Sequence, residues 1–432
     1  MRLPLTAAAL LIGAALVAAC SQPAPETAPE GDRGTRAPAT SPPADARTPD
    51  PDPDQVTSWG PTVGEVARAE QLAREMTTEQ LAGQVIVGRY DGTDPAAAAR
   101  LVSELHLAGV CVTSTNVAGE AQVRATTAAV AQAHAASGRD WPAVIGVDEE
   151  GGIVAHLGGV ATEFPPFAAA GAAVASQDEA GEEIVTRAAH ATALELRSLG
   201  FTWVFAPVAD VTIGAADPTI GSRSPSGDPA LAARAVSAAV AGYQQGGLVS
   251  TTKHFPGHGG VTADSHETLP SLDSSLPQLR GRDLRPFRAA VEAGDPAIMM
   301  AHLDVRALQD GMPSSLAPKV YDFLRDDVGF EGVAITDSLG MGAALSRDFP
   351  ALRALAAGAD LLLMPVDATT THELVVRAVE DGQVPRERLE EAAGRVIALQ
   401  LWQQRVAADR PVPPDVTEQA QRAAADLAAA GS

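Results

Sequence analysis

The stretch VSTTKHFPGHGGVTADSHETLP, residues 249–270, contains the features that decide the fold. It opens with a strand-like run at 249–253, and that run ends in two polar residues, Lys253 and His254. Proline and glycine follow at 256–260, where the chain must leave a sheet and its backbone can approach a ligand closely. The stretch therefore predicts a strand whose C-terminal end opens into a polar loop.

Seven other short apolar runs repeat this pattern, each followed by an Ala-, Arg- and Glu-rich segment of helical character. Continuous apolar strands separated by helices indicate a parallel sheet that is covered on both faces. Eight such units favour a single closed (β/α)8 barrel of the TIM type over the alternative, an open doubly wound α/β sheet. The seven runs are 84–88, 108–112, 143–147, 203–208, 297–301, 332–336 and 360–364.

Polar residues gather at the C-terminal ends of these runs, which is the face where barrel enzymes build their active sites. The placement therefore favours the barrel. Residues 366–432 read as helices that complete it and leave no room for a second, C-terminal α/β sandwich domain. We expect residues 61–432 to form one catalytic domain. The polar residues at strand ends are Asp148, Asp210, Lys253, His254, His302 and Asp337.

The first sixty residues read as a leader and a tether. An apolar run from Leu5 to Ala19 is shorter than the roughly 20 residues that span a membrane, and it ends in small residues directly before Cys20. This ending resembles the bacterial lipobox, whose thiol is acylated. We predict a lipoprotein signal peptide at 1–19, a lipid anchor on Cys20, and a disordered tether at 20–60. The protein is then expected to be exported and anchored at the outer face of the cytoplasmic membrane.

Composition narrows the class of protein and of partner. The chain has 432 residues, 46% of them hydrophobic, so it can bury a sizeable core. Its 54 acidic and 31 basic residues give a net charge of −23, which repels phosphate backbones and argues against a nucleic-acid partner. Cys111 is the one cysteine besides Cys20, so we expect it to pack in the core without a disulfide. We expect a monomer.

The loop after Lys253 carries a candidate proton-transfer pair. Asp264 and His266 are two residues apart, so in an extended segment their side chains share one side, and the carboxylate can orient the imidazole. A histidine held by an aspartate is a common proton-transfer device. Asp337, at the end of its strand, supplies a carboxylate that can attack an anomeric carbon and form a glycosyl-enzyme ester. The three residues together predict double displacement.

A metal site is the alternative for the same loop, because His254, His258 and His266 lie close together in sequence near Asp264. Metal-dependent amidohydrolases on barrels take a His-x-His pair from the first strand, and residues 84–89 contain no histidine. We therefore expect neither a metal nor another cofactor. The acidic run at 148–150 could bind a cation, but the two glycines after it favour a tight turn whose acids contact sugar hydroxyls.

With these motifs the chain resembles glycoside hydrolase family 3, and within it the single-domain β-N-acetylhexosaminidases of peptidoglycan turnover, here in a lipoprotein form. The resemblance extends over residues 65–400. The sequence departs from the usual family pattern at two positions. Ile153 stands where an arginine commonly follows the two glycines, and His156 stands where another basic residue is usual. The motifs are GVDEEGG at 146–152, FAPVAD at 205–210, IGSRS at 220–224, KHFPGHG at 253–259, DSH at 264–266 and AITDSL at 334–339.

The resemblance implies roles for individual residues. Asp337 corresponds to the nucleophile, and His266 with Asp264 to the acid/base dyad of this branch. A histidine as proton donor avoids a second anion beside the nucleophile. The residues implied to hold the non-reducing sugar are Asp148, Arg223, Lys253 and His254, with His302 beside them.

The implied activity is that of an exo-acting retaining β-N-acetylglucosaminidase that removes terminal GlcNAc from peptidoglycan fragments. Three alternatives stay open: a phosphorylase that resolves the same intermediate with phosphate, a β-glucosidase of the same family, and a lipoprotein that binds cell-wall sugars without turnover. The family's glucosidases place their acid/base carboxylate on a second domain, so the Asp-x-His loop is what favours the hexosaminidase branch.

Overall fold

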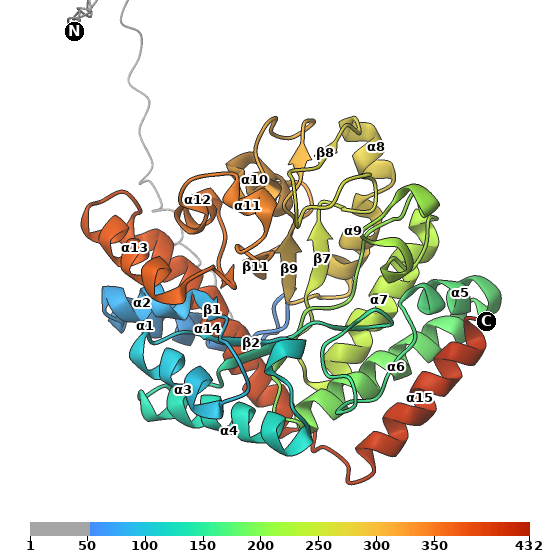
Figure 1. The fold of residues 1–432 in the computed structure, drawn as a ribbon, viewed down its shortest axis with the longest axis horizontal. Coiled ribbons are helices and arrows are strands. Elements are labelled where there is room, and N and C mark those ends of the chain that lie inside the picture. The colour runs from blue at the N-terminus through green and yellow to red at the C-terminus, as the bar shows by residue number, and fades with distance from the viewer. Residues whose placement is uncertain (1–51) are drawn as a thin grey trace, which may run out of the picture. The chain divides into compact units, whose positions relative to one another are not determined.

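The computed structural model describes residues 52–432. Parallel strands lie at the centre of this part of the chain, and helices surround them (Figure 1). The predicted signal peptide, Cys20 and most of the predicted tether lie outside the described residues. Within residues 52–432, no helix has the length and apolar character needed to cross a membrane.

Eight short strands follow the eight predicted runs and pair in parallel. Five form a sheet in the order β12-β1-β2-β3-β6, and three form a second sheet in the order β11-β9-β7. The predicted α/β class with a parallel sheet is therefore confirmed. The strands are β1 (Ile86–Gly88), β2 (Gly109–Val112), β3 (Val144–Val147), β6 (Trp203–Val204), β7 (Thr252–Phe255), β9 (Ala297–Met300), β11 (Val333–Thr336) and β12 (Leu362–Leu363).

Isolated parallel bridges lie at both junctions between the two sheets. Two of them join the β6 segment to the β7 segment, and one joins β11 to the residue before β12. The strands therefore curl toward one another at both edges. The bridges pair Val249 with Trp203, Val208 with Lys253, and Ile335 with Leu361.

Some strands begin or end away from the predicted positions. Gln84 belongs to helix α2, so β1 begins only at Ile86. β7 runs from Thr252 to Phe255, which places His254 inside the strand rather than after it. β6 stops at Val204, shortly before Pro207, which has no N–H to donate to a neighbouring strand.

Helices pack on the outside of the strands, and many begin with a side-chain cap that satisfies free backbone N–H groups. Thr62 and Thr77 form capping boxes at α1 and α2, and Asp228 caps α7 ahead of Pro229. The helices are α1 (Val63–Glu75), α2 (Thr78–Gln84), α3 (Pro95–Glu104), α4 (Glu120–Ala136), α5 (Ala168–Gln177), α6 (Glu179–Ser198), α7 (Pro229–Gly246), α8 (Leu276–Gly281), α9 (Leu284–Glu292), α10 (Pro318–Asp326), α11 (Gly342–Leu345), α12 (Pro350–Ala357), α13 (Ala368–Glu380), α14 (Arg386–Ala408) and α15 (Val416–Ala430).

The Ala-rich tail forms the predicted last helix, α15, which lies along α6 (Figure 1). Two smaller pairs of strands complete the structure. The antiparallel pair β4 (Glu149–Gly151) and β5 (Val154–Ala155) follows β3, and the parallel pair β8 (Ser271–Leu272) and β10 (Asp304–Val305) lies on later loops.

The folded part begins earlier than the predicted boundary at residue 61. Trp59 is 6% exposed and belongs to the hydrophobic core, and Val56 forms an antiparallel bridge with Thr62. Ser58 donates a hydrogen bond to Glu331, at 2.5 Å. Residues 52–60, which we assigned to the end of the tether, therefore pack on the domain because Trp59 supplies the apolar surface that the rest of the segment lacks.

Candidate active site

A cavity of about 460 Å³ lies at the C-terminal ends of the parallel strands. The acidic strand end after β3, the polar end of β7 and the end of β11 all contribute to it, as the sequence predicts. Asp264 and His302 are the two predicted site residues of the described chain that do not line it. Those that do are Asp148, Arg223, Lys253, His254, His266 and Asp337.

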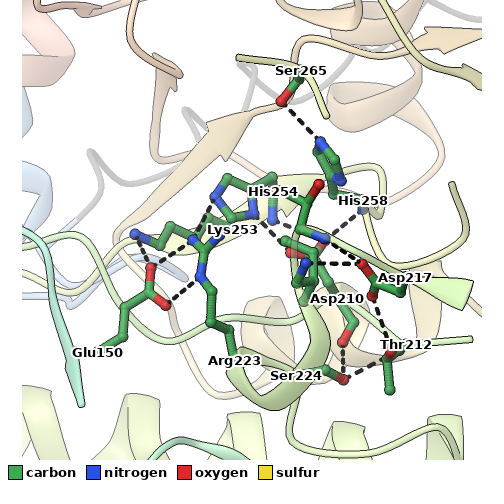
Figure 2. A network of polar contacts seen from close by, with 12 residues as sticks. Glu150, Asp210, Thr212, Asp217, Arg223, Ser224, Lys253, His254, His258 and Ser265 are labelled. Atoms are coloured by element: carbon green, nitrogen blue, oxygen red, sulfur yellow. Dashed lines mark hydrogen bonds and ion pairs between the residues drawn. The ribbon is translucent and has the colours of Figure 1, made fainter. Parts of the chain in front are cut away.

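Glu150 is the centre of an ion-pair network on one side of the cavity (Figure 2). Its carboxylate accepts two hydrogen bonds from Arg223, both at 2.8 Å, and lies 2.6 Å from Nζ of Lys253. Lys253 also donates to Asp148 at 2.5 Å. Burial opposes ionisation of Glu150, but the two cations outweigh it and lower its pKa to about 2. The network holds Arg223, Lys253 and Asp148 in fixed positions.

The hairpin of β4 and β5 supplies this carboxylate. Gly151 and Gly152 adopt φ angles of 89° and 61°, in the left-handed region that favours glycine. A Cβ atom on either glycine would come within 3.0 Å of the Pro165–Pro166 segment, so the turn needs both glycines. The predicted tight turn is therefore present, and it directs Glu150 inward while Ile153 at its tip is 79% exposed.

Asp210 organises the histidines beside this network. Its buried carboxylate lies 2.7 Å from Nδ1 of His254 and accepts backbone N–H bonds from His254 and His258 at 3.2 and 2.6 Å. Burial opposes ionisation of Asp210, and the neighbouring His254 reverses the effect, so the pKa of Asp210 stays below its ordinary value. With Nδ1 turned to this anion, Nε2 of His254 faces Arg223 at 3.5 Å.

Asp337 stands at the end of β11, half-buried in the cavity wall. Its Oδ1 accepts a hydrogen bond from the backbone N–H of Ser338 at 2.7 Å. Burial raises the pKa of this carboxyl, but His254 and His302, together with the Ser338 N–H, bring it below the ordinary value. Asp337 is therefore an ionised carboxylate, which is the state that a nucleophile requires.

His302 lies behind Asp337 rather than in the cavity wall. It is fully buried, with Nδ1 2.6 Å from Oγ of Ser315 and Nε2 2.9 Å from the carbonyl oxygen of Ser338. Both ring nitrogens are thus used by the protein. The expectation that His302 lies beside the sugar-holding residues needs correction, because the structure places it under the nucleophile's strand end.

Asp264 and His266 form the predicted pair on the loop after β7. Oδ1 of Asp264 lies 2.7 Å from Nδ1 of His266 and accepts the His266 backbone N–H at 2.9 Å. Partial burial raises the pKa of the Asp264 carboxyl, but these two bonds outweigh that effect and keep the pKa below its ordinary value. The His266 side chain is 63% exposed, so it lies at the mouth of the cavity and is open to solvent.

Ser265, between these two residues, connects the loop to the rest of the site. Its Oγ lies 2.9 Å from Nε2 of His258, and the side chain is buried (Figure 2). Two backbone N–H groups at the start of α11 donate to the same loop, Gly342 to the carbonyl of His266 at 3.1 Å and Ala343 to that of Ser265 at 3.2 Å. The Ser265 end of the loop is therefore held both to His258, near the start of the same loop, and to the segment that follows Asp337.

The three histidines of the alternative metal site have separate partners. His254 faces Asp210, His258 faces Ser265, and His266 faces Asp264. Within residues 52–432, no three His, Cys, Asp or Glu side chains are grouped as ligands for one ion.

Two residues, Glu150 and Asp210, have a role in the site that the sequence does not predict. Glu150 shares its motif with Asp148, and Asp210 is the last residue of its own motif; each is buried and bonded to a cation or an imidazole from a distant segment. The signal available in the sequence was the acidic residue itself at a strand end. The partner of Glu150 could not be predicted from the sequence, because Arg223 is 73 residues away along the chain.

Comparison with known proteins agrees with these motifs. The model of the glycosyl hydrolase family 3 N-terminal domain matches residues 74–399. β-Hexosaminidase LpqI of Mycobacterium tuberculosis is 32% identical over 339 residues, which cover 74% of this chain and 82% of that protein. β-Hexosaminidase A of Pseudoalteromonas piscicida is 30% identical over 334 residues, or 71% of this chain, but the match spans only 55% of that protein's length.

A solved structure extends the likeness to three dimensions. The family 3 β-N-acetylglucosaminidase of a Paenibacillus species superimposes with a TM-score of 0.74 at 33% identity, covering 81% of this chain and 68% of that one. The resemblance inferred from the motifs is thereby confirmed, since the family model covers most of the chain. The chain belongs to glycoside hydrolase family 3.

Proposed function

We propose that the protein is an exo-acting retaining β-N-acetylglucosaminidase that removes terminal GlcNAc from peptidoglycan fragments. One observation carries the proposal: Asp337, ionised, and His266, held by Asp264, line the same cavity at the strand ends. Relatives named β-hexosaminidase and a related structure named β-N-acetylglucosaminidase support the choice of sugar.

The first half of the reaction needs a nucleophile and a proton donor. Asp337 attacks the anomeric carbon and forms a glycosyl-enzyme ester, while the leaving oxygen takes a proton from His266. Because Nδ1 of His266 faces the Asp264 carboxylate at 2.7 Å, the proton is transferred through Nε2. The Asp264 anion stabilises the imidazolium before transfer and fixes the ring's orientation.

The second half reverses these roles. His266, now neutral at Nε2, accepts a proton from a water molecule that attacks the anomeric carbon; the bond from that carbon to Asp337 breaks, and Asp337 leaves as a carboxylate. The cluster on the other side of the cavity holds the sugar: Glu150 fixes Arg223 and Lys253, Lys253 in turn holds Asp148, and the three present charged groups that suit sugar hydroxyls and an acetamido carbonyl.

The direct test is hydrolysis of p-nitrophenyl β-GlcNAc by Asp337→Asn. The variant keeps the size of the side chain and removes the nucleophile, so we expect kcat to fall on the order of 10⁴-fold or more. Full activity in this variant would exclude the mechanism. Absence of turnover in the unmutated protein would instead indicate a protein that binds sugars without cleaving them.

The same assay in phosphate buffer separates hydrolysis from phosphorolysis. We expect free GlcNAc as the product in both buffers. Appearance of GlcNAc 1-phosphate would identify a phosphorylase, and faster release from the β-glucoside than from the β-GlcNAc glycoside would identify a glucosidase.

We also infer that the two parallel sheets are parts of one closed (β/α)8 barrel, and that residues 52–432 act as a single catalytic domain. The parallel bridges at both sheet junctions support this inference. The strand-end residues that line the cavity also support it, because all of them lie at the C-terminal end of their strands.

We further propose that the protein is exported and held at the membrane surface by a lipid on Cys20, acting there as a monomer. The support is the lipobox-like sequence before Cys20. Detergent-phase partitioning of the protein from its native host should be lost in Cys20→Ala, and equal partitioning of the two forms would contradict the anchor.

A further inference from the structure

A second cavity, of about 280 Å³, lies at the end of the parallel strands opposite to the candidate active site. Arg139 and Trp141 line it just before β3 begins, and His106 lines it just before β2 begins. The residues of the candidate active site follow the C-terminal ends of the strands, and none of them lines this second cavity. It is therefore a separate site, and the proposed hydrolysis makes no use of it.

Arg139 places a buried positive charge in the wall of this cavity. Its side chain is 8% exposed, and Lys253 is the one other lysine or arginine of residues 52–432 that is buried. Lys253 lies between the carboxylates of Asp148 and Glu150, whereas Arg139 forms no ion pair within the described chain. Burial without a counter-ion lowers the pKa of Arg139 to about 10. A buried charge of this kind is costly to the folded protein, and a bound anion would offset that cost.

The guanidinium keeps part of its hydrogen-bonding capacity unused. Its Nε donates to Oγ of Ser137 at 2.8 Å, and its Nη1 donates to the carbonyl oxygens of His106 and Leu107 at 2.9 and 2.8 Å. Its Nη2, which carries two N–H groups, is buried and bonds to no atom of residues 52–432. The three occupied donors hold the guanidinium in place, so Nη2 is a fixed donor that lacks an acceptor.

Trp141 supplies a second donor of the same kind. Its side chain is 6% exposed, and its Nε1 is also buried without an acceptor in the described chain. The neighbouring His134 packs edge-on, with ring centroids 6.2 Å apart, and its Nε2 likewise bonds to no atom of residues 52–432. Burial lowers the pKa of His134 to about 3, so this ring is neutral. Buried donors in folded proteins nearly always have an acceptor, which a ligand in this cavity would provide.

The rest of the wall restricts the kind of anion. Leu72 and Met76, at the end of α1, give the cavity an apolar side. Glu75 and Asp140 line it as well, and both are exposed, so they repel a second negative charge on a ligand. A volume of 280 Å³ is near the lower limit for small-molecule sites. These features favour a small anion with one charge and a short apolar part.

We propose that this cavity is a binding site for a small aliphatic monocarboxylate. The carboxylate oxygens accept hydrogen bonds from Nη2 of Arg139 and from Nε1 of Trp141, and the aliphatic chain lies against Leu72 and Met76. A carboxylate suits these donors because charge-assisted hydrogen bonds are stronger than those to a neutral acceptor.

The test uses butyrate as the probe and butyramide as its uncharged counterpart, with sodium chloride at equal concentration as the salt control. Because a ligand that binds only the folded state stabilises it, butyrate should raise the melting temperature of the purified protein above the values in butyramide and in chloride. Butyrate should also shift the indole N–H resonance of Trp141, which is identified by its absence from the spectrum of Trp141→Phe. Equal effects of butyrate and butyramide, or no effect of either, would overturn the site.

Two variants and a matched control locate the effect. Arg139→Lys keeps the charge and loses Nη2, and Trp141→Phe keeps an aromatic ring and loses the N–H. Each should weaken the affinity for butyrate, obtained from the concentration dependence of the melting temperature, about tenfold. Arg197→Lys is the control, because Arg197 also donates to backbone carbonyls without forming an ion pair in the described chain, and it does not line the cavity.

The control variant should bind butyrate as the parent protein does. If Arg139→Lys fails to fold, Trp141→Phe alone decides the matter. Unchanged affinity in Trp141→Phe, or an equal loss in Arg139→Lys and Arg197→Lys, would show that butyrate binds elsewhere and would overturn the proposal.

Discussion

Buried carboxylates of this protein fall into two groups with opposite effects on stability. Glu150 and Asp360 are surrounded by cations, which overcome burial and lower the pKa of each to about 2. Glu149 and Asp295 lack such partners, and burial raises the pKa of each to about 7. The first group stabilises the ionised fold, whereas the second is ionised only at a cost to the folded state.

Asp295 allows this difference to be measured. Its buried carboxyl accepts bonds only from Ser250 and Thr252, at 2.7 and 3.3 Å. Between its ordinary pKa of 3.8 and its folded pKa of about 7, the folded protein holds one proton more than the unfolded chain. The free energy of unfolding should therefore fall as pH rises through this window, by up to about 1.4 kcal/mol per pH unit.

Asp295→Asn removes this titration, so its stability should decline less steeply than that of the parent between pH 4.5 and 7. Urea unfolding at several pH values measures the slope. Glu104→Gln, which alters an exposed acid at the end of α3, should keep the parent slope. If the free energy of unfolding of the parent and of Asp295→Asn declined with pH at the same slope, the prediction that Asp295 is protonated in the folded protein would be wrong.

Sequence reasoning identified site residues better than it identified their partners. Asp337, His266 and Asp264 could be chosen because a strand end and a two-residue spacing are visible in the sequence. The roles of Glu150 and Asp210 depend on contacts with Arg223 and His254, which come from distant segments. His302 was misplaced for the same reason, since its ring reaches Ser315 and Ser338 beneath the surface.

At the scale of elements, the path of the loop of residues 256–268 is set by the hydrogen bonds that hold it. The predicted strand 249–253 is displaced to Thr252–Phe255, and the loop then turns back so that Ser265 meets His258. Strand positions could be predicted because buried apolar runs are continuous. The path of the loop could not, because it depends on one hydroxyl and on two backbone N–H groups of α11.

Ser265→Ala tests whether this attachment positions the proton donor. Loss of the hydroxyl removes the partner of Nε2 of His258, whose Nδ1 already has none within the described chain. We expect kcat for the aryl glycoside to fall about tenfold while the melting temperature changes little, since one hydrogen bond contributes about 1 kcal/mol. Steady-state kinetics and thermal unfolding of the same preparation give both values.

Thr262→Ala is the control for this variant. It removes a hydroxyl from the same loop at an exposed residue whose side chain makes no hydrogen bond within residues 52–432. Its kcat should match that of the parent enzyme. A comparable loss in both variants would mean that the loop is sensitive to any change, and a normal kcat in Ser265→Ala would show that the bond to His258 does not position His266.

At the scale of the whole molecule, the seam between β11 and β12 joins the two sheets, and one buried carboxylate, that of Asp360, lies at its start. Asp360 is fully buried and accepts the backbone N–H of Ala334 at 3.0 Å. Three arginines surround it, Arg325 at 2.7 Å, Arg388 at 2.8 Å and Arg395 at 3.1 Å. It thereby ties the seam to α10 and α14, at the end of the strands away from the cavity.

Asp360→Asn should destabilise the whole domain, because it leaves three cations around a neutral group. Removing one partner of a buried ion cluster costs about 3–5 kcal/mol, which a urea titration detects as a lower midpoint. Below the melting temperature kcat should be unchanged, since Asp360 is remote from the cavity. Asp140→Asn, which breaks an exposed pair with Arg68, should shift the midpoint little. A normal midpoint for Asp360→Asn would contradict the role of the seam.

The fold class could be read from the sequence because each buried strand lies between helical segments, and that order admits few architectures. The boundary of the folded part could not be read as well. Trp59 is one apolar residue after a long polar tether, and only its contacts in the core show that residues 52–60 belong to the domain.

The hairpin tip offers a way to observe the cavity directly. Ile153 is 79% exposed between two short strands whose inner residues face the site, and Cys111, the one cysteine among residues 52–432, is completely buried. Ile153→Cys would therefore give the folded domain a single accessible thiol. A fluorophore attached there would report arrival and departure of saccharides in real time, including in variants that no longer turn them over.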